Sequence, residues 1–268
     1  MAEAIIHSLP HQMQRRAWKV VVVGAGGTGS AFLPNLARLH HAMVALGHPG
    51  GIECLVLDDD TVSETNVGRQ GFYPCDVGQH KALLLVNRLN ALMGTAWTAQ
   101  PVRVDSRTRL RADIVIGCVD SRKARHAILK ASERGSVDYY LDCGNEVDRG
   151  QVFIGQVGKP RFDRLPHVGD LLPELLDAKI DKGDDMPSCS MAEALSKQSL
   201  VINQAIAVQA FNILWSFYRT GTLPFSGVYV NLATGRTNPV PVDPAAWGRF
   251  GYVQPPKPAR KRRKKVAA

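Results

Sequence analysis

Apolar residues follow two alternating patterns along this chain: short continuous runs and longer stretches with helical spacing. The short runs are rich in β-branched residues, which predicts buried strands. We expect these strands at Trp18–Val23, Ile52–Leu57 and residues 97–104, 112–119, 137–142, 151–157 and 225–232. The longer stretches place apolar residues three or four positions apart, which predicts helices. We expect these helices at residues 28–46, 77–93, 121–133 and 190–218.

The alternation of strands and helices predicts an α/β domain with a doubly wound, Rossmann-like fold, a mainly parallel sheet and helices on both faces. The C-terminal third is expected to complete this domain and to cover its cleft. The chain then divides into an N-terminal arm (1–17), a nucleotide-binding domain (18–158), a crossover loop (159–189), a helix and strand that complete the domain (190–253) and a basic tail (254–268). Within the crossover loop, residues 168–178 suit one further helix.

The net charge of +9 is concentrated at the C-terminus. Seven Lys and Arg residues lie within residues 257–265, and without them the remaining charge is only +2. The tail lacks apolar periodicity, so we expect it to be disordered. It suits contact with nucleic acid or an acidic partner, or it serves solubility alone.

The N-terminal residues lack a basic start followed by an apolar stretch, so a secretory signal is not predicted. Apolar runs are also too short to predict a membrane span. We therefore expect a cytoplasmic protein with no membrane association.

A glycine-rich loop follows the first predicted strand and opens the first predicted helix. Its glycines are Gly24, Gly26, Gly27 and Gly29. Glycines let the backbone approach a phosphate closely, and the helix N-terminus offers N–H groups to the anion. Asp58, at the end of the second strand, suits a ribose hydroxyl. These features alone fit an NAD-dependent oxidoreductase as well as an ATP-using enzyme.

The segment after Asp58 favours ATP. Arg69 offers a planar pair of donors for phosphate oxygens, and Lys81 offers a compact positive charge. Adenylation builds negative charge on the α-phosphate as pyrophosphate leaves, so fixed cationic donors are needed there. Asp120 follows a buried strand and suits Mg²⁺ on the phosphates. Ser121, the next residue, is expected to cap a helix beside the nucleotide.

The composite motif resembles the ThiF/MoeB/ubiquitin-activating (HesA/MoeB/ThiF) superfamily, and within it the ThiF proteins of PRTRC systems. The motif reads G-x-G-G-x-G, then D-x-D-x-V-x-x-x-N-x-x-R-Q from Asp58, then a lysine and a strand-end aspartate. The resemblance implies that Gly27 lines the phosphates and Asp58 holds the ribose. It also implies that Asn66 and Arg69 contact the phosphates, Lys81 stabilises the leaving pyrophosphate, and Asp120 carries Mg²⁺.

The implied activity is ATP-dependent adenylation of a carboxylate, the C-terminal glycine of a small ubiquitin-like or sulfur-carrier-like protein. Three alternatives stay open: a tRNA-modifying adenylating enzyme, the NAD-dependent oxidoreductase, and an inactive nucleotide-dependent module that binds a partner. The oxidoreductase would leave Asn66, Arg69 and Lys81 without a role.

The chain departs from the family pattern at its cysteines. Many members hold a structural zinc with two C-x-x-C pairs; this chain has five cysteines and no such pair, so we predict no zinc. Cys189 falls where family members have a nucleophilic cysteine, and it is either that nucleophile or a loop thiol. Cys143 is a weaker candidate for the same chemistry.

Two further features leave their roles open. Arg15 and Arg16 match the position of an N-terminal arginine with which homodimeric relatives reach the partner's ATP; an exposed pair is the alternative. Asn203 interrupts the apolar pattern of the last helix, and it faces either a groove or solvent.

Overall fold

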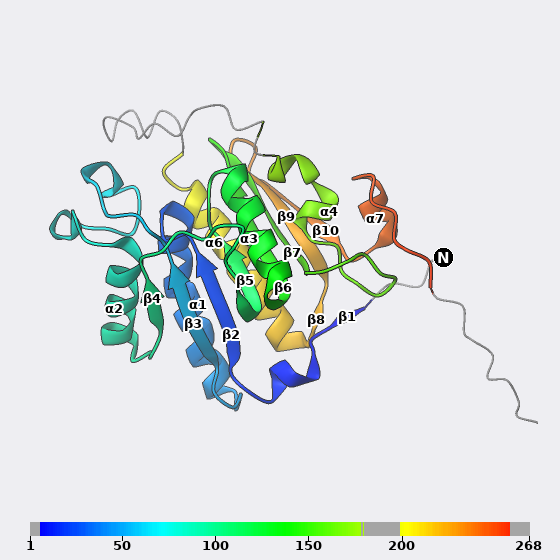
Figure 1. Ribbon diagram of the computed structural model, residues 1–268, viewed down its shortest axis with the longest axis horizontal. Helices are drawn as coiled ribbons and strands as arrows, with labels where there is room; N and C mark the ends of the chain where they lie inside the picture. The colour runs from blue at the N-terminus through cyan, green and yellow to red at the C-terminus, as the bar shows by residue number, and fades with distance from the viewer. Residues whose placement is uncertain (1–5, 178, 180–198, 258–268) are drawn as a thin grey trace, which may run out of the picture.

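The protein is described by a computed structural model, which covers residues 6–177, 179 and 199–257 (Figure 1). An eight-stranded sheet runs through its centre in the order β10-β9-β7-β6-β5-β2-β3-β4. Five neighbouring strands are parallel: β4 (Thr98–Gln100), β3 (Ile52–Leu57), β2 (Trp18–Val23), β5 (Arg111–Gly117) and β6 (Ser136–Asn145). Three antiparallel strands extend the sheet beyond β6: β7 (Arg149–Gln156), β9 (Phe225–Asn231) and β10 (Arg236–Pro241).

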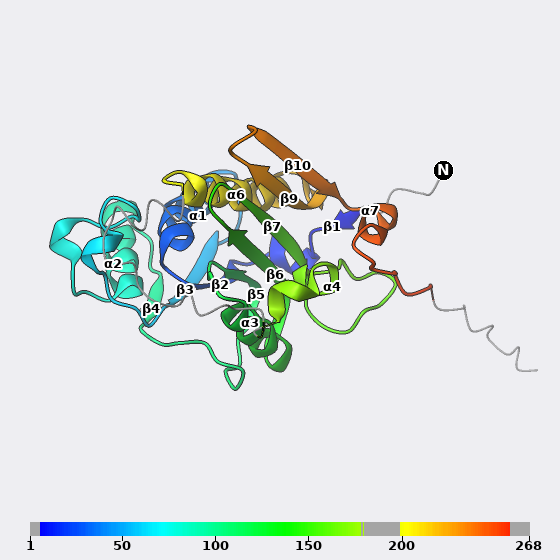
Figure 2. The same cartoon turned by 90° about the horizontal axis from the view of Figure 1, so that it is seen from above.

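Helices cover both faces of the sheet. Seen from above, α1 and α6 lie on one face, and α3 and α4 lie on the other (Figure 2). The helices are α1 (Gly27–Ala45), α2 (Lys81–Met93), α3 (Arg122–Arg134), α4 (Val168–Leu171), α6 (Ile202–Thr220) and α7 (Pro244–Gly248). Short 3-10 turns are η1 (His11–Gln14), η2 (Glu64–Asn66), η3 (Pro74–Asp76) and η4 (Pro173–Leu176), and β1 (His7–Ser8) pairs with β8 (Thr222–Leu223). The doubly wound α/β prediction is confirmed.

The central strands are apolar on both sides because helices cover both sides. In β2, five of six residues are buried. On one face, Leu33 and Leu36 of α1 and Ile213 and Phe217 of α6 are fully buried in the same core. Burying one such side chain contributes roughly 1.5–3 kcal/mol. This core holds the N-terminus of α1 firmly against the carboxyl ends of the strands.

Several predicted boundaries differ from the structure. A strand was expected at residues 97–104, but only Thr98–Gln100 form one. A helix was expected at 168–178, where the structure has the two short elements α4 and η4. The last helix is described from Ile202, since residues 190–198 of the prediction lie outside the described residues.

Strand β10 was not expected from the sequence. Pro239 and Pro241 lie within it, and proline weakens a strand pattern because it lacks an N–H for the ladder. The strand tolerates these prolines because it is the outermost strand of the sheet. Together β9 and β10 complete the domain from its C-terminal side.

Among the described residues, no helix has both the length and the apolar character that crossing a bilayer requires. Residues 258–268, which make up most of the basic tail, lie outside the described residues. The expected disorder of the tail therefore stays a prediction.

Candidate functional site

The four glycines of the loop between β2 and α1 serve different purposes. Gly24 has φ +95°, and a Cβ there would lie 2.6 Å from the Cys118 carbonyl oxygen. A Cβ on Gly29 would lie 2.1 Å from the Gly24 carbonyl oxygen. These two glycines therefore allow β2, α1 and β5 to pack closely. A Cβ on Gly26 would have its nearest neighbour 3.9 Å away, so the loop is open at this position.

Asp58 lies directly beneath the glycine loop. One carboxylate oxygen accepts a hydrogen bond from the Ala25 N–H at 2.6 Å, and the other accepts one from the Asp60 N–H at 2.8 Å. Burial raises the pKa of Asp58, while these two hydrogen bonds and the charge of Lys81 oppose that rise. The end of β3 is thereby fixed to the loop that follows β2.

Lys81 is the first residue of α2 and is buried. Its Nζ lies 2.9 Å from a carboxylate oxygen of Asp60, and its backbone N–H donates to the Asp60 carbonyl oxygen at 3.0 Å. Asp60, an exposed residue of the loop after β3, holds Lys81 beside Asp58, and the sequence did not indicate this pairing.

The segment between Asp60 and Lys81 crosses back to α1. Asn66 is buried in η2, where its side-chain oxygen accepts from the Ser63 N–H at 3.0 Å. The Gly71 N–H donates to Ser30 Oγ in the first turn of α1 at 3.0 Å. Arg69, two residues before Gly71, is therefore carried close to the start of α1.

Arg69 and Asp120 approach each other from different parts of the sequence. Arg69 is partly buried; burial lowers the pKa of its guanidinium, and the carboxylate of Asp120 opposes that shift. Asp120 is exposed and lies between β5 and α3. Ser121 caps α3, since its Oγ accepts from the Ala124 N–H at 3.2 Å. Asp120 thus remains available to a ligand.

A buried ion pair supports Asp120 from below, and sequence inspection missed it. Arg125 Nε lies 3.3 Å from an oxygen of Asp142, and the two side chains are 6% and 0% exposed. The same oxygen accepts from the Tyr140 hydroxyl at 2.8 Å. Arg125 also donates to the carbonyl oxygens of Val119 and Asp120 at 3.2 and 3.4 Å. Arg125 lies one turn after the cap Ser121, to whose carbonyl oxygen its backbone N–H donates at 3.1 Å, and no local pattern paired it with Asp142.

Asn203 faces the glycine loop from α6. Its side-chain oxygen accepts from Thr28 Oγ1 at 3.0 Å and from Asn145 Nδ2 at 2.7 Å, and all three side chains lie at the base of α1. A Cβ on Gly27 would lie 2.6 Å from the Asn203 amide nitrogen. Of the two possibilities left open for Asn203, the structure has it buried against the loop.

The other predicted residues lie apart from this group or outside the described residues. Cys189 lies outside them. Cys143 is buried, and a hydrogen bond with Cys118 together with burial raises the pKa of its thiol well above the usual value. A nucleophilic role for Cys143 is therefore disfavoured. Arg16 forms an ion pair with Asp113 of its own chain at 2.6 Å, and Arg15 is exposed.

The residues present fit a nucleoside triphosphate with one Mg²⁺. The open position at Gly26 leaves room for a phosphate against α1, and Arg69 and Lys81 supply positive charge at the same edge of the sheet. Among the described residues, no group of three or more His, Cys, Asp or Glu side chains is arranged to hold a metal. A single carboxylate at Asp120 still suits Mg²⁺, which takes most other ligands from phosphates and water.

Comparison with known proteins places the whole chain rather than its individual site residues. The model of the ThiF family matches residues 4–241. The chain is 28% identical over 230 residues to the adenylyltransferase and sulfurtransferase UBA4 of Meyerozyma guilliermondii, covering 83% of this chain and 49% of that protein. The chain thus spans about half the length of this curated relative. The UBA4 of Yarrowia lipolytica is 31% identical over 124 residues, covering 44% of this chain and 28% of that protein.

Solved structures share the fold. A crystal structure of E. coli MccB with AMPCPP and MccA has a TM-score of 0.59 at 18% identity, covering 86% of this chain and 65% of that chain. A structure of PaaA has a TM-score of 0.57 at 15% identity, covering 87% and 75%.

Proposed function

This chain belongs to the ThiF family, and we propose on that basis that it uses ATP to adenylate a carboxylate. One observation supports this most directly. The charges of Arg69 and Asp120 interact, and Lys81, held by Asp60, lies beside Asp58 at the carboxyl end of β3. An oxidoreductase needs only the loop and Asp58, whereas adenylation requires the added charges.

In the proposed reaction, a carboxylate oxygen of the substrate attacks the α-phosphorus of ATP. A new oxygen–phosphorus bond forms, the bond to the β-phosphate bridge breaks, and the products are acyl-AMP and pyrophosphate. Arg69 stabilises the negative charge on the α-phosphate, and Lys81 stabilises the leaving pyrophosphate. Asp58 accepts from a ribose hydroxyl, and Asn66 donates to a phosphate. Mg²⁺ at Asp120 would neutralise phosphate charge.

We propose that the substrate is the C-terminal glycine of a small ubiquitin-like or sulfur-carrier-like protein. The names of the relatives support a small partner of this kind: UBA4 is an adenylyltransferase and sulfurtransferase, and MccB was solved together with MccA. Cys189 is the candidate acceptor of the transferred acyl group.

The test is ATP–pyrophosphate exchange, measured with small Gly-terminated proteins from the same source. Arg69→Ala and Asp120→Ala should each lower exchange about 10²-fold or more, because each removes a group that stabilises developing charge. Arg236→Ala, an exposed arginine on β10, is the matched control and should behave as the wild type. Near-normal exchange by both site variants would overturn the assignment.

The role of Cys189 is tested separately. A covalent adduct between this chain and the Gly-terminated protein, cleaved by thiols on a gel, should disappear in Cys189→Ala while pyrophosphate exchange continues. An adduct that persists in Cys189→Ala would exclude Cys189 as the acceptor.

A further inference from the structure

A strongly basic cavity lies at the end of the sheet opposite the glycine loop. Its volume is about 630 Å³, and its lining includes Arg16, Lys19, Arg109, Arg111 and Arg134. These residues come from the amino ends of β2 and β5 and the C-terminus of α3. From Lys19 to Gly24 the chain runs almost the whole of β2, about 16 Å at ~3.3 Å per residue. The cavity is therefore separate from the proposed ATP site.

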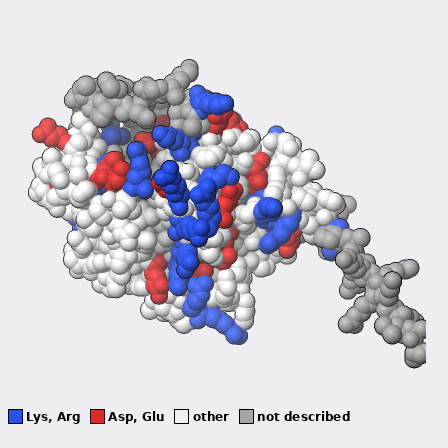
Figure 3. Space-filling model, viewed as in Figure 1, with Lys and Arg blue, Asp and Glu red and all other residues white. Residues whose placement is uncertain are grey.

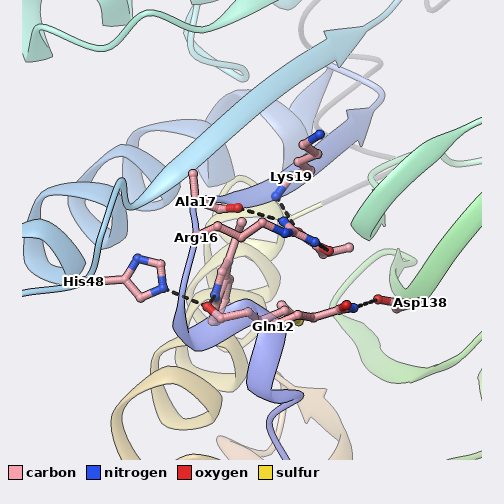
Figure 4. A network of polar contacts seen from close by, with 9 residues as sticks. Gln12, Arg16, Ala17, Lys19, His48 and Asp138 are labelled. Atoms are coloured by element: carbon pink, nitrogen blue, oxygen red, sulfur yellow. Dashed lines mark hydrogen bonds and ion pairs between the residues drawn. The ribbon is translucent and has the colours of Figure 1, made fainter.

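Most of the positive charge in this cavity lacks an internal counterion. Arg16 is neutralised by Asp113, to which it donates two hydrogen bonds, at 2.7 and 2.6 Å (Figure 4). Within residues 6–177, 179 and 199–257, no ion pair involves Lys19, Arg109, Arg111 or Arg134. All four are exposed, and Asp138, bonded to Gln12, is the only other acid of the lining. The cavity thus keeps a net positive charge.

The positive charge also continues beyond the cavity. Lys and Arg side chains form a band down the middle of one face, where α3 and β5 lie in Figure 1 (Figure 3). On α3, Arg134 of the cavity lining is exposed, whereas Lys130 pairs with Glu133 at 2.8 Å. The helix has 13 residues and is about 20 Å long at ~1.5 Å per residue. Such a band matches a linear polyanion better than a single small anion.

The lining favours a phosphate backbone over an acidic protein. Among its eleven residues, only Ala112 and Gly135 lack a polar side chain, and none is aromatic. Protein interfaces rely on buried aromatic or aliphatic anchors, which are missing from this cavity. Binding to nucleic acid phosphates needs only cations and donors. The missing aromatic residues also mean that bases have no stacking platform.

We infer that this basic face, formed by Lys19, Arg109, Arg111 and Arg134, binds nucleic acid through its phosphate backbone without reading the base sequence. The seven Lys and Arg residues of 257–265 add positive charge in the same chain. Lys257 is the last described residue of the chain, and its ammonium lies 5.6 Å from the centre of the Phe162 ring.

The experiment measures binding of a short fluorescein-labelled RNA, single-stranded and as a duplex, to the full chain by anisotropy at several salt concentrations. The variant is Arg109→Gln/Arg111→Gln/Arg134→Gln. The control is Arg38→Gln/Arg236→Gln/Arg249→Gln, which removes three exposed arginines elsewhere and gives the same net charge. Pyrophosphate exchange should be unchanged in both, because neither set belongs to the ATP site.

We expect the face variant to bind at least tenfold more weakly than the control. The slope of log affinity against log salt should also become shallower by about 2, since each lost phosphate contact removes roughly 0.7–0.9. Equal binding by face variant and control would overturn the inference and assign RNA binding to the tail alone. Displacement of the RNA by poly-glutamate at equal charge concentration would also overturn it, because the face would then accept any acidic chain.

Discussion

Replacing Arg125 by methionine should destabilise the protein more than any exposed arginine change. Methionine keeps the unbranched stem of the side chain but removes the guanidinium, which leaves the Asp142 carboxylate with only the Tyr140 hydroxyl. Both members of the ion pair are almost completely excluded from solvent. Breaking such a buried pair costs about 3–5 kcal/mol, because an uncompensated charge remains in a medium of low polarity.

An exposed pair provides the comparison. Arg103 Nε lies 3.8 Å from Asp59, and the Arg103 side chain is 83% exposed. Solvent screens this pair, so Arg103→Met should cost at most about 1 kcal/mol. The two changes remove the same charge from the chain, and only burial distinguishes them. A total stability of about 5–15 kcal/mol would leave Arg125→Met folded but weakened.

Urea unfolding followed by circular dichroism measures the free energy of unfolding for both variants. The double variant Arg125→Met/Asp142→Leu should regain part of the loss. A cost for Arg125→Met equal to that of Arg103→Met would refute the reasoning.

Three further experiments test other parts of the structure. Gly29→Ala should lower stability by roughly 1–3 kcal/mol, because its Cβ meets the Gly24 carbonyl oxygen. Gly26→Ala should keep the melting temperature but weaken ATP binding, which calorimetry measures. A larger loss of stability in Gly26→Ala than in Gly29→Ala would contradict the loop geometry. Iodoacetamide at about pH 8 should label the exposed Cys75 before the buried Cys54 and Cys143. Burial raises the pKa of the Cys54 thiol, and a hydrogen bond with Cys118 together with burial raises that of Cys143. Peptide mass spectrometry measures the order of labelling, and faster labelling of Cys143 would contradict this prediction. Burial lowers the pKa of His167, so the folded state resists its protonation and stability should fall as the pH drops below about 6.5. His167→Gln should flatten that fall in urea titrations, and an unchanged pH profile would exclude this contribution.

The sequence predicted the parts of the fold that depend on local pattern. Residues 18–23 and 52–57 are continuous apolar runs, and the structure has strands with the same bounds. The helix was expected at 121–133 with Ser121 as its cap, and the structure has Ser121 capping Arg122–Arg134. Local pattern and burial agree at these positions, so periodicity was sufficient.

Pairings between distant residues could not be read from the sequence. Asp60 with Lys81, and Arg125 with Asp142, join residues 21 and 17 positions apart, and only folding brings them together. The basic face was missed for a related reason. Its cations are scattered from Lys19 to Arg134 and are balanced in the total charge by acids on other surfaces. A sum of charges therefore concealed a surface that becomes continuous only after folding.

The outer strands of the sheet bear on how copies of this protein behave when concentrated. An exposed strand edge is a template on which another chain can add its own strand, which leads to aggregation. At one edge, β4 has only three residues. At the other, Pro239 and Pro241 remove two N–H donors from β10, and its register shifts at Val240. Both edges are therefore poor templates, and the same prolines that disguised β10 in the sequence help keep the folded molecules apart.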